Sequence, residues 1–407
     1  MPMQKKKSKI TRLYNRMDVK IVIILALAFM LVLPSYIEQE IINPTIRLYT
    51  NGTKIMQRDD EVVIHTLTVS TNDRTNEINS NTRATNIGQT WFQQKDVAYM
   101  KTLGLNAVEI HTIGFQRVSN SNGEVNEAYF KDWIDEWVQW CKDEQMYIVL
   151  NFQRFNPTPG SFERYGWYYV PNWFYSDYGK PTTFTGVAEV CLDFWDTTVS
   201  HMDDERENYY KVLEYTANRY KNNPWVIISP RNEPQHFIHK YAGETGFPSK
   251  LAVYDGYMDV SQASINRIRR AGFDGLLFIE IPYSFTEIQE RYDQLEDFDG
   301  DNIVWEYHNY VGNKDFSEWK RKVSGAKAKV DTLNRPFYLG EWAMFPSELR
   351  NTYPYEETTE AMMNYLDTLG ISECQHSWGL LFGYPKYVGM GRTDVEVAWY
   401  IDYQQSR

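Results

Sequence analysis

Short apolar runs alternate along the chain with longer segments of helical periodicity. Runs rich in β-branched and aromatic side chains predict eight strands, at residues 61–70, 105–113, 146–152, 224–229, 275–281, 303–307, 336–340 and 377–382. Apolar residues that recur every three or four positions predict helices, at residues 91–104, 126–145, 205–220, 253–271, 316–332 and 358–369. Gly104, Gly272 and Gly370 follow three of these helices, as expected where a helix ends.

This order of elements predicts the fold class. Strands separated by helices form parallel sheets, and eight such units in about 350 residues fit a closed (β/α)8 barrel, the TIM barrel, with loop insertions. An open, doubly wound sheet is the alternative. No Gly-x-Gly-x-x-Gly follows a predicted strand and the sequence has no phosphate-binding loop, so we expect no nucleotide cofactor and no other cofactor.

The first 37 residues differ from the rest of the chain. Residues 1–20 contain seven Lys or Arg and one Asp, and residues 21–33 are apolar without interruption. A basic segment followed by an apolar one is typical of a signal peptide or signal anchor. The run is shorter than the about 20 residues that span a membrane, but residues 34–37 can extend it. No small-x-small cleavage site follows, so we expect a signal anchor over residues 19–37 rather than a cleaved signal.

Either form of the N-terminal segment divides the chain in the same way. Residues 1–37 are expected to form a cytoplasmic basic tail with a hydrophobic anchor or signal, and residues 38–407 one extracytoplasmic barrel domain. The net charge of the chain is −12, so the chain without its basic first 20 residues carries −18. This acidic body argues against nucleic acid and against an anionic membrane surface as partners, and it favours a neutral ligand.

Cysteine usage predicts neither disulfides nor a metal. The three cysteines, Cys141, Cys191 and Cys374, are widely spaced and odd in number. They give no disulfide framework and no Cys-x-x-Cys pattern of metal ligands. We therefore expect no metal site, and the sequence does not indicate an oligomeric state.

Polar residues gather where the predicted strands end. In a TIM barrel the active site lies at the carboxyl ends of the strands, and bringing several carboxylates together there costs stability unless they serve a purpose. For Glu109, Glu280 and Glu306, an outward, solvated position is an equal alternative. The residues at these ends are His65, Glu109, His111, Asn151, Gln153, Arg154, Arg231, Asn232, Glu233, Glu280, Tyr283, Glu306, His308, Tyr310, Glu341, Trp342 and Trp378.

Three short motifs and a tryptophan follow the later strands in a fixed order. They are Asn232-Glu233-Pro234, His308-Asn309-Tyr310, Gly340-Glu341-Trp342 and Trp378. In this order the set resembles the cellulase family of retaining glycoside hydrolases, glycoside hydrolase family five, or a near relative among (β/α)8 glycosidases. The resemblance covers roughly residues 45–400. Asn-Glu-Pro alone is a weak signal, and the ordered set is a much more specific one.

The resemblance implies roles for these residues. Glu233 would be the general acid/base and Glu341 the nucleophile, with carboxyl groups about 5–5.5 Å apart. Asn232 would donate to the sugar 2-hydroxyl, Tyr310 would bond the nucleophile, and His308 would orient the site. The expected substrate-binding residues are Asn232, His308, Tyr310, Trp378, Trp342, Arg231, His111 and Gln153.

The chain departs from the family pattern on two strands. Glu109 stands where the family usually has an arginine that supports the nucleophile, and Gln153 stands where it usually has a histidine. Arg231 or Arg154 is a candidate replacement cation. Strict alternation would put Arg231 and Glu233 on one face of the strand and turn Asn232 away, so these roles require an irregular strand end.

The first hypothesis is an exported retaining β-glycoside hydrolase that acts on a β-linked glucan or mannan. A cell-surface carbohydrate-binding protein on the same barrel, with little or no catalysis, is an alternative, and a transglycosylase that uses the same glutamates is another. The sequence specifies neither the sugar and its linkage nor endo or exo action.

Overall fold

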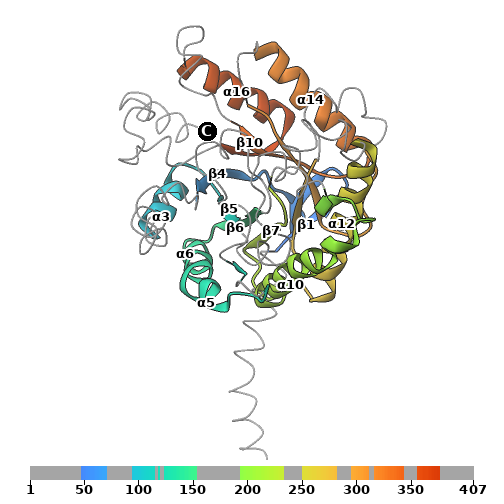
Figure 1. The fold of residues 1–407 in the computed structure, drawn as a ribbon. Helices are drawn as coiled ribbons and strands as arrows, with labels where there is room; N and C mark the ends of the chain where they lie inside the picture. Colours follow the sequence, from blue (N-terminus) through green and yellow to red (C-terminus); the bar gives the residue numbers. More distant parts are fainter. Residues whose placement is uncertain are drawn as a thin grey trace, which may run out of the picture. The chain divides into compact units, whose positions relative to one another are not determined.

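The computed structural model describes residues 47–70, 94–114, 118–119, 123–153, 193–232, 250–281, 295–310, 316–342 and 355–375. Eight of its strands form a closed barrel, in which each strand pairs in parallel with the next and β11 pairs with β4 (Figure 1). The predicted (β/α)8 barrel is thereby confirmed. Its strands are β4 (His65–Ser70), β5 (Ala107–Gly114), β6 (Tyr147–Gln153), β7 (Val226–Ser229), β8 (Leu277–Glu280), β9 (Ile303–His308), β10 (Phe337–Trp342) and β11 (Ser372–Gln375).

Helices surround the barrel and cover the outer face of its strands (Figure 1). The segment predicted as one helix over residues 126–145 begins as α5, passes through one π-helical turn, η2, and continues as α6. Its buried face carries Phe130, Ile134, Trp137 and Cys141, in the spacing that predicted it. The helices are α3 (Gln94–Thr102), α5 (Glu127–Tyr129), η2 (Phe130–Ile134), α6 (Asp135–Asp143), η3 (Ser200–Met202), α10 (Asp203–Tyr220), α12 (Lys250–Arg270), α14 (Phe316–Thr332) and α16 (Tyr355–Leu369).

A small antiparallel sheet precedes the barrel and was not predicted. It contains β1 (Leu48–Asn51), β2 (Lys54–Gln57) and β3 (Asp60–Glu61). Gln57 Nε2 donates to the hydroxyl of Tyr147 at 2.5 Å, and the backbone N–H of Thr50 donates to Asn302 Oδ1 at 2.9 Å. These partners stand at the starts of β6 and β9, so the sheet contacts the amino-terminal end of the barrel. The first barrel strand therefore begins at His65, not at residue 61.

The last strand also differs from the prediction. The strand that closes the barrel is Ser372–Gln375, five residues before the predicted 377–382, which lie outside the described residues. Three of its four residues, Ser372, Glu373 and Gln375, are polar, and each is at most 4 % exposed. Buried polar side chains disguise this strand from any search for apolar runs.

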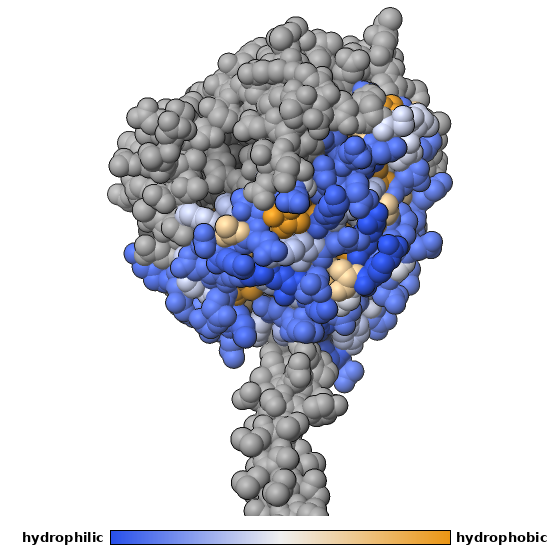
Figure 2. All heavy atoms as spheres, turned by 60° about the horizontal axis from the view of Figure 1, so that its bottom comes forward, coloured by the Kyte–Doolittle hydropathy of each residue, from blue (hydrophilic) through white to orange (hydrophobic). Residues whose placement is uncertain are grey.

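The apolar core lies mainly between the barrel and its helices. Large side chains also enter the barrel, where the rings of Phe278 and Tyr338 lie 4.3 Å apart. On the face shown in Figure 2 the described surface is mainly hydrophilic, with a few separate apolar spots, as expected for a domain that buries its apolar side chains. Within the described ranges, no helix has both the length and the apolarity needed to cross a membrane. Residues 19–37 lie outside those ranges, so the anchor stays a prediction.

Candidate active site

The barrel interior contains an unusual number of buried carboxylates. Two contacts across the barrel establish that they point inward, because Tyr338 of β10 donates to Glu109 of β5, and Ser229 of β7 donates to Glu306 of β9. For Glu109, Glu280 and Glu306 the structure therefore excludes the outward, solvated alternative. The interior carboxylates, each at most 2 % exposed, are Glu109, Glu280, Glu306 and Glu341, whereas the equally buried Glu373 of β11 faces the helices together with Trp342.

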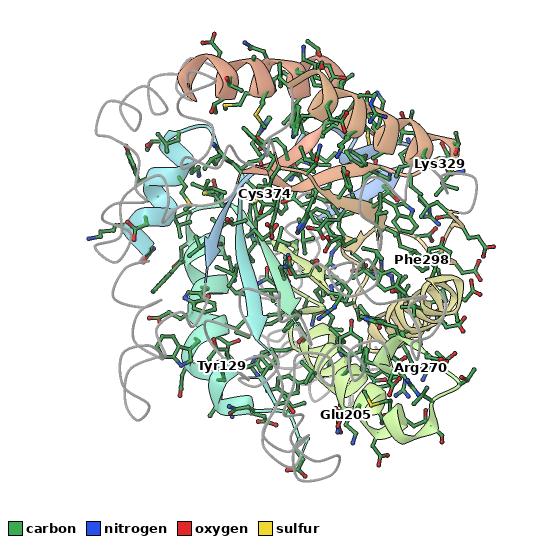
Figure 3. All side chains as sticks on the ribbon, turned by 45° about the horizontal axis from the view of Figure 1, so that its top comes forward. Tyr129, Glu205, Arg270, Phe298, Lys329 and Cys374 are labelled. Carbon is green, nitrogen blue, oxygen red and sulfur yellow. The ribbon has the colours of Figure 1, made fainter. Side chains whose placement is uncertain are left out.

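This concentration of acid acts on the neighbouring thiol. Cys374 lies on β11 among the strands of the barrel (Figure 3). Burial raises the pKa of the Cys374 thiol well above its usual value, and the nearby carboxylates Glu109 and Glu373 raise it further. The interior therefore disfavours any additional negative charge.

Glu341 is the carboxylate at the carboxyl end of β10. The pairing of β10 with β9 shifts register between Leu339 and Glu341, and an irregularity of this kind re-aims a side chain at a strand end. The hydroxyl of Tyr310 donates to Glu341 Oε2, which is the contact that the resemblance implies. On the other side, His308 Nδ1 lies 3.4 Å from Glu341 Oε1. A buried carboxylate held by such groups is oriented and stabilised in its charged form.

His308 links Glu341 to two further carboxylates. Its Nε2 lies 3.3 Å from Glu306 Oε1, and its Nδ1 lies 3.6 Å from Glu280 Oε1. Burial raises the pKa of Glu306, whereas its hydrogen bond with His308 opposes that rise. His308 thus stands among three acidic side chains, from β8, β9 and β10.

Asn232 is held by a neighbour on β6. Asn151 Nδ2 donates both to Glu109 Oε1 at 2.9 Å and to Asn232 Oδ1 at 3.0 Å. The backbone N–H of Asn232 also donates to the carbonyl of Phe152 at 2.8 Å. Since Oδ1 is engaged, the Nδ2 group of Asn232 is the one available as a donor, and within the described part of the chain it has no hydrogen-bond partner.

The structure describes the surroundings of Arg231, and its role in substrate binding stays a prediction. β7 ends at Ser229, so alternation no longer governs the residues that follow. The Arg231 guanidinium lies over the ring of Trp195, 5.4 Å from its centroid. It also lines a small cavity with Tyr209 of α10, Tyr257 of α12 and Glu280 of β8. The side chain therefore points toward the helices, whereas Asn232 points into the barrel, and His308 is the basic side chain that the structure places beside Glu341.

Trp342 is buried beside Glu341, and its role in substrate binding stays a prediction. Its side chain is 0 % exposed. Its indole Nε1 donates to Glu373 Oε2 at 2.7 Å, and Glu373 Oε1 lies 3.1 Å from His65 Nδ1. His65 is the first residue of β4 rather than a residue at its end. Trp342 is thus a structural neighbour of Glu341, anchored to β11 and through it to β4.

Several predicted residues cannot be placed. Glu233, Trp378, Arg154 and the side chains of His111 and Gln153 lie outside the described residues, and the separation of Glu233 and Glu341 stays a prediction. Conversely, the sequence analysis gave no role to Ser229, Tyr338 or Glu373. A polar residue inside an otherwise apolar strand is the signal that could have identified them. Among the residues that the structure describes, no cluster of His, Cys, Asp or Glu has the arrangement of a metal site.

Comparison with known proteins agrees with this geometry. The family model described as Cellulase (glycosyl hydrolase family 5) matches residues 71–380. None of the curated protein sequences matches the chain significantly.

Solved structures with the same fold are numerous. An endogalactoceramidase superposes with a TM-score of 0.64 at 21 % identity, over 89 % of this chain and 84 % of that one. Endo-glycoceramidase II from Rhodococcus sp. superposes with a TM-score of 0.61 at 16 % identity, over 84 % of this chain and 79 % of that one. The cellulase Cel5C_n superposes with a TM-score of 0.57 at 14 % identity, over 90 % of this chain and 94 % of that one. At these identities the likeness establishes the barrel fold.

Proposed function

Since the chain belongs to glycosyl hydrolase family 5 and is a glycoside hydrolase, we propose that it cleaves a β-glycosidic bond with retention of configuration. Glu341 is the nucleophile and Glu233 the general acid/base in this proposal. The observation that carries it is the environment of Glu341, a buried carboxylate at a strand end that accepts from Tyr310 and lies beside His308. A nucleophile must be ionised and aimed, and these two neighbours favour both conditions.

The reaction follows from two carboxyl groups on opposite sides of the scissile bond. Glu233 protonates the leaving oxygen while Glu341 attacks the anomeric carbon, which gives a covalent glycosyl-enzyme and the free alcohol. Glu233 then takes a proton from water, and that water releases the sugar from Glu341. Asn232 Nδ2 donates to the 2-hydroxyl, a hydrogen bond that strengthens in the transition state.

The direct test is to trap the intermediate. A 2-fluoro glycoside with a good leaving group should add one sugar mass to the wild-type protein, in the peptide that contains Glu341. Glu341→Ala should abolish hydrolysis, and Glu136→Gln, on the exposed side of α6, is the matched control that should keep full activity. Label on another residue, or hydrolysis by Glu341→Ala, would refute the assignment.

The substrate proposal has two members. A β-linked glucan or mannan is the first, in line with the family description. The second is a glycoceramide, favoured because endogalactoceramidase and endo-glycoceramidase II superpose with higher TM-scores than the cellulase does. Incubation with β-1,4-glucan oligosaccharides, β-1,4-mannan oligosaccharides and lactosylceramide in detergent separates the two, since release of ceramide occurs only with the lipid substrate. Products longer than the starting oligosaccharide would instead indicate transglycosylation.

We also propose that residues 19–37 deliver the barrel across a membrane and hold it there. The support is the order of a basic segment and an apolar run in the sequence. Alkaline extraction of membranes from expressing cells should leave the full-length chain in the pellet. Recovery of the protein in the supernatant would contradict the anchor.

A further inference from the structure

Both ring nitrogens of His308 face carboxylates. Nε2 lies 3.3 Å from Glu306 Oε1, while Nδ1 lies 3.4 Å from Glu341 Oε1 and 3.6 Å from Glu280 Oε1. The side chains involved are at most 3 % exposed, so bulk water does not shield these contacts. A neutral imidazole carries a single N–H, and its position decides whether Glu341 meets a donor or a lone pair.

The number of protons shared by His308 and Glu306 decides this. If the pair holds two protons, the imidazole is either doubly protonated, or neutral with a hydrogen on Nδ1 and a protonated Glu306 that donates to Nε2. Both arrangements put a hydrogen on Nδ1, the ring nitrogen that faces Glu341 Oε1 at 3.4 Å and Glu280 Oε1 at 3.6 Å. If the pair holds one proton, a hydrogen on Nε2 satisfies Glu306 and turns a lone pair toward Glu341, which is repulsive. Three buried carboxylates around one imidazole favour the arrangement with two protons.

We propose that Glu306 is a positioning residue that keeps a hydrogen on His308 Nδ1 and so presents a fixed donor to the nucleophile. This inference rests on the proposed function, in which Glu341 is that nucleophile. Glu306 does not touch the substrate in this scheme and acts through His308 alone. The donor in this proposal is His308 Nδ1, on β9. The family resemblance leads one to expect an arginine that supports the nucleophile on β5, but this chain has Glu109 at that position.

The position of Glu306 is built by its surroundings. Ser229 Oγ donates to Oε2 at 2.9 Å, and the side chain is 0 % exposed. A Cβ added to Gly340 would lie 2.0 Å from Glu306 Oε1, so the absence of a side chain at Gly340 is what makes room for this carboxylate. Burial raises the pKa of Glu306, which helps the pair to retain its second proton.

Other titratable groups face His308 and Glu306 from the surrounding strands. Glu233, which comes next after Asn232 in the sequence, lies outside the described residues. Glu109 adds negative charge that raises the pKa of Glu306 further. The groups that the structure describes are Glu280 on β8, Glu341 and Tyr338 on β10, Tyr310 after β9, and Glu109 on β5.

The pH dependence of Glu306→Gln tests the proposal. Glutamine keeps the size of the side chain, but its amide can accept from Nε2–H as well as donate to a bare Nε2, so it no longer holds the hydrogen on Nδ1, and the tautomer that turns a lone pair toward Glu341 becomes populated. We expect kcat to fall by about 10- to 100-fold at pH 8 with KM little changed, the scale expected when a residue that orients a histidine is lost. Acidification should bring the variant back toward wild type, because a doubly protonated His308 carries a hydrogen on Nδ1 without help. A ratio of the two kcat values that is constant from pH 5 to pH 8 would overturn the proposal, because a purely structural defect has no such pH dependence.

A spectroscopic readout is independent of catalysis. In wild-type protein labelled with 15N-histidine, with the His308 signals assigned by their loss in His308→Gln, Nδ1 should be protonated at pH 7. Finding Nε2–H with a bare Nδ1 in the wild type would overturn the inference, even if Glu306→Gln does not fold. If Glu341→Ala retained hydrolysis, the proposed function would fail instead, while this measurement would still report on Glu306.

Discussion

Asn151→Ala removes the side chain that connects Glu109 to Asn232. Two buried hydrogen bonds disappear, one to a carboxylate and one to an amide oxygen. The first is worth about 1.5–3 kcal/mol and the second about 0.5–1.5 kcal/mol. The free energy of unfolding should therefore fall by about 2–4.5 kcal/mol. With an unfolding entropy of about 2.1 cal/mol/K per residue over roughly 360 residues, the melting temperature should drop by about 3–6 °C.

Catalysis should suffer separately from stability. Without Asn151, nothing in the described structure fixes which way the amide of Asn232 points, so its Nδ2 donor should face the substrate for only part of the time. We expect kcat/KM to fall by about 10-fold in Asn151→Ala and by about 100-fold in Asn232→Ala, because hydrogen bonds to the 2-hydroxyl supply several kcal/mol in glycosidases. The assay is hydrolysis of an aryl β-glycoside at a temperature where all variants are folded.

The double variant decides whether Asn151 acts through Asn232. If it does, Asn151→Ala adds little once Asn232 is alanine, so the double variant should match Asn232→Ala within about 2-fold. Independent effects would multiply to about 1,000-fold. A loss of that size would refute the reasoning that the amide of Asn151 serves to orient Asn232.

Three further changes have defined expectations. Tyr310→Phe removes the hydroxyl that donates to Glu341 and should lower kcat by about 10- to 150-fold, as for one hydrogen bond to a charged group; an unchanged kcat would count against the contact. Glu233→Ala should nearly abolish cleavage of natural glycosides yet retain turnover of aryl glycosides with good leaving groups, which need no acid; equal losses on both substrates would argue against its acid role. Burial opposes ionisation of Asp135, but the hydrogen bonds from Arg219 and Tyr220, together with the positive charge of Arg219, outweigh it and lower the pKa of that carboxyl. The ionised Asp135 should therefore stabilise the fold above about pH 4, and this stabilisation should be lost as the pH falls through the lowered pKa. Asp135→Asn should flatten the acid side of a plot of melting temperature against pH. An unaltered acid side would contradict this expectation.

The barrel was predictable because most of its strands are apolar on both faces. Leu277–Glu280 and Phe337–Trp342 stand out as short runs between helical segments, and parallel sheets bury such runs completely. The prediction failed where buried strand residues are polar. Ser372–Gln375 was missed because Glu373 and Gln375 are buried, and Glu373 is satisfied by an indole that no local pattern reveals.

The sequence motifs of the site could be predicted, but the orientations of its side chains could not. Glu341 and Tyr310 come together as the order of motifs implied. The sequence could not show that Arg231 turns toward the helices, because that depends on where β7 ends and on the ring of Trp195 across the layer. Nor could it show that Glu306 and Glu280 both face His308, since contacts between strands depend on the register of the barrel.

The contacts from Trp342 to Glu373 and from Glu373 to His65 have a consequence for the order in which the barrel strands assemble during folding. They join the residue next to Glu341, the proposed nucleophile, to β11 and to β4, the last and first strands of the ring. A folding intermediate with seven strands in place would contain Glu341 but lack the neighbour that anchors its strand end. Hydrolysis is then a reporter of ring closure. During refolding from denaturant it should recover after helical circular dichroism has returned, and in step with the part of the tryptophan fluorescence change that Trp342→Phe removes.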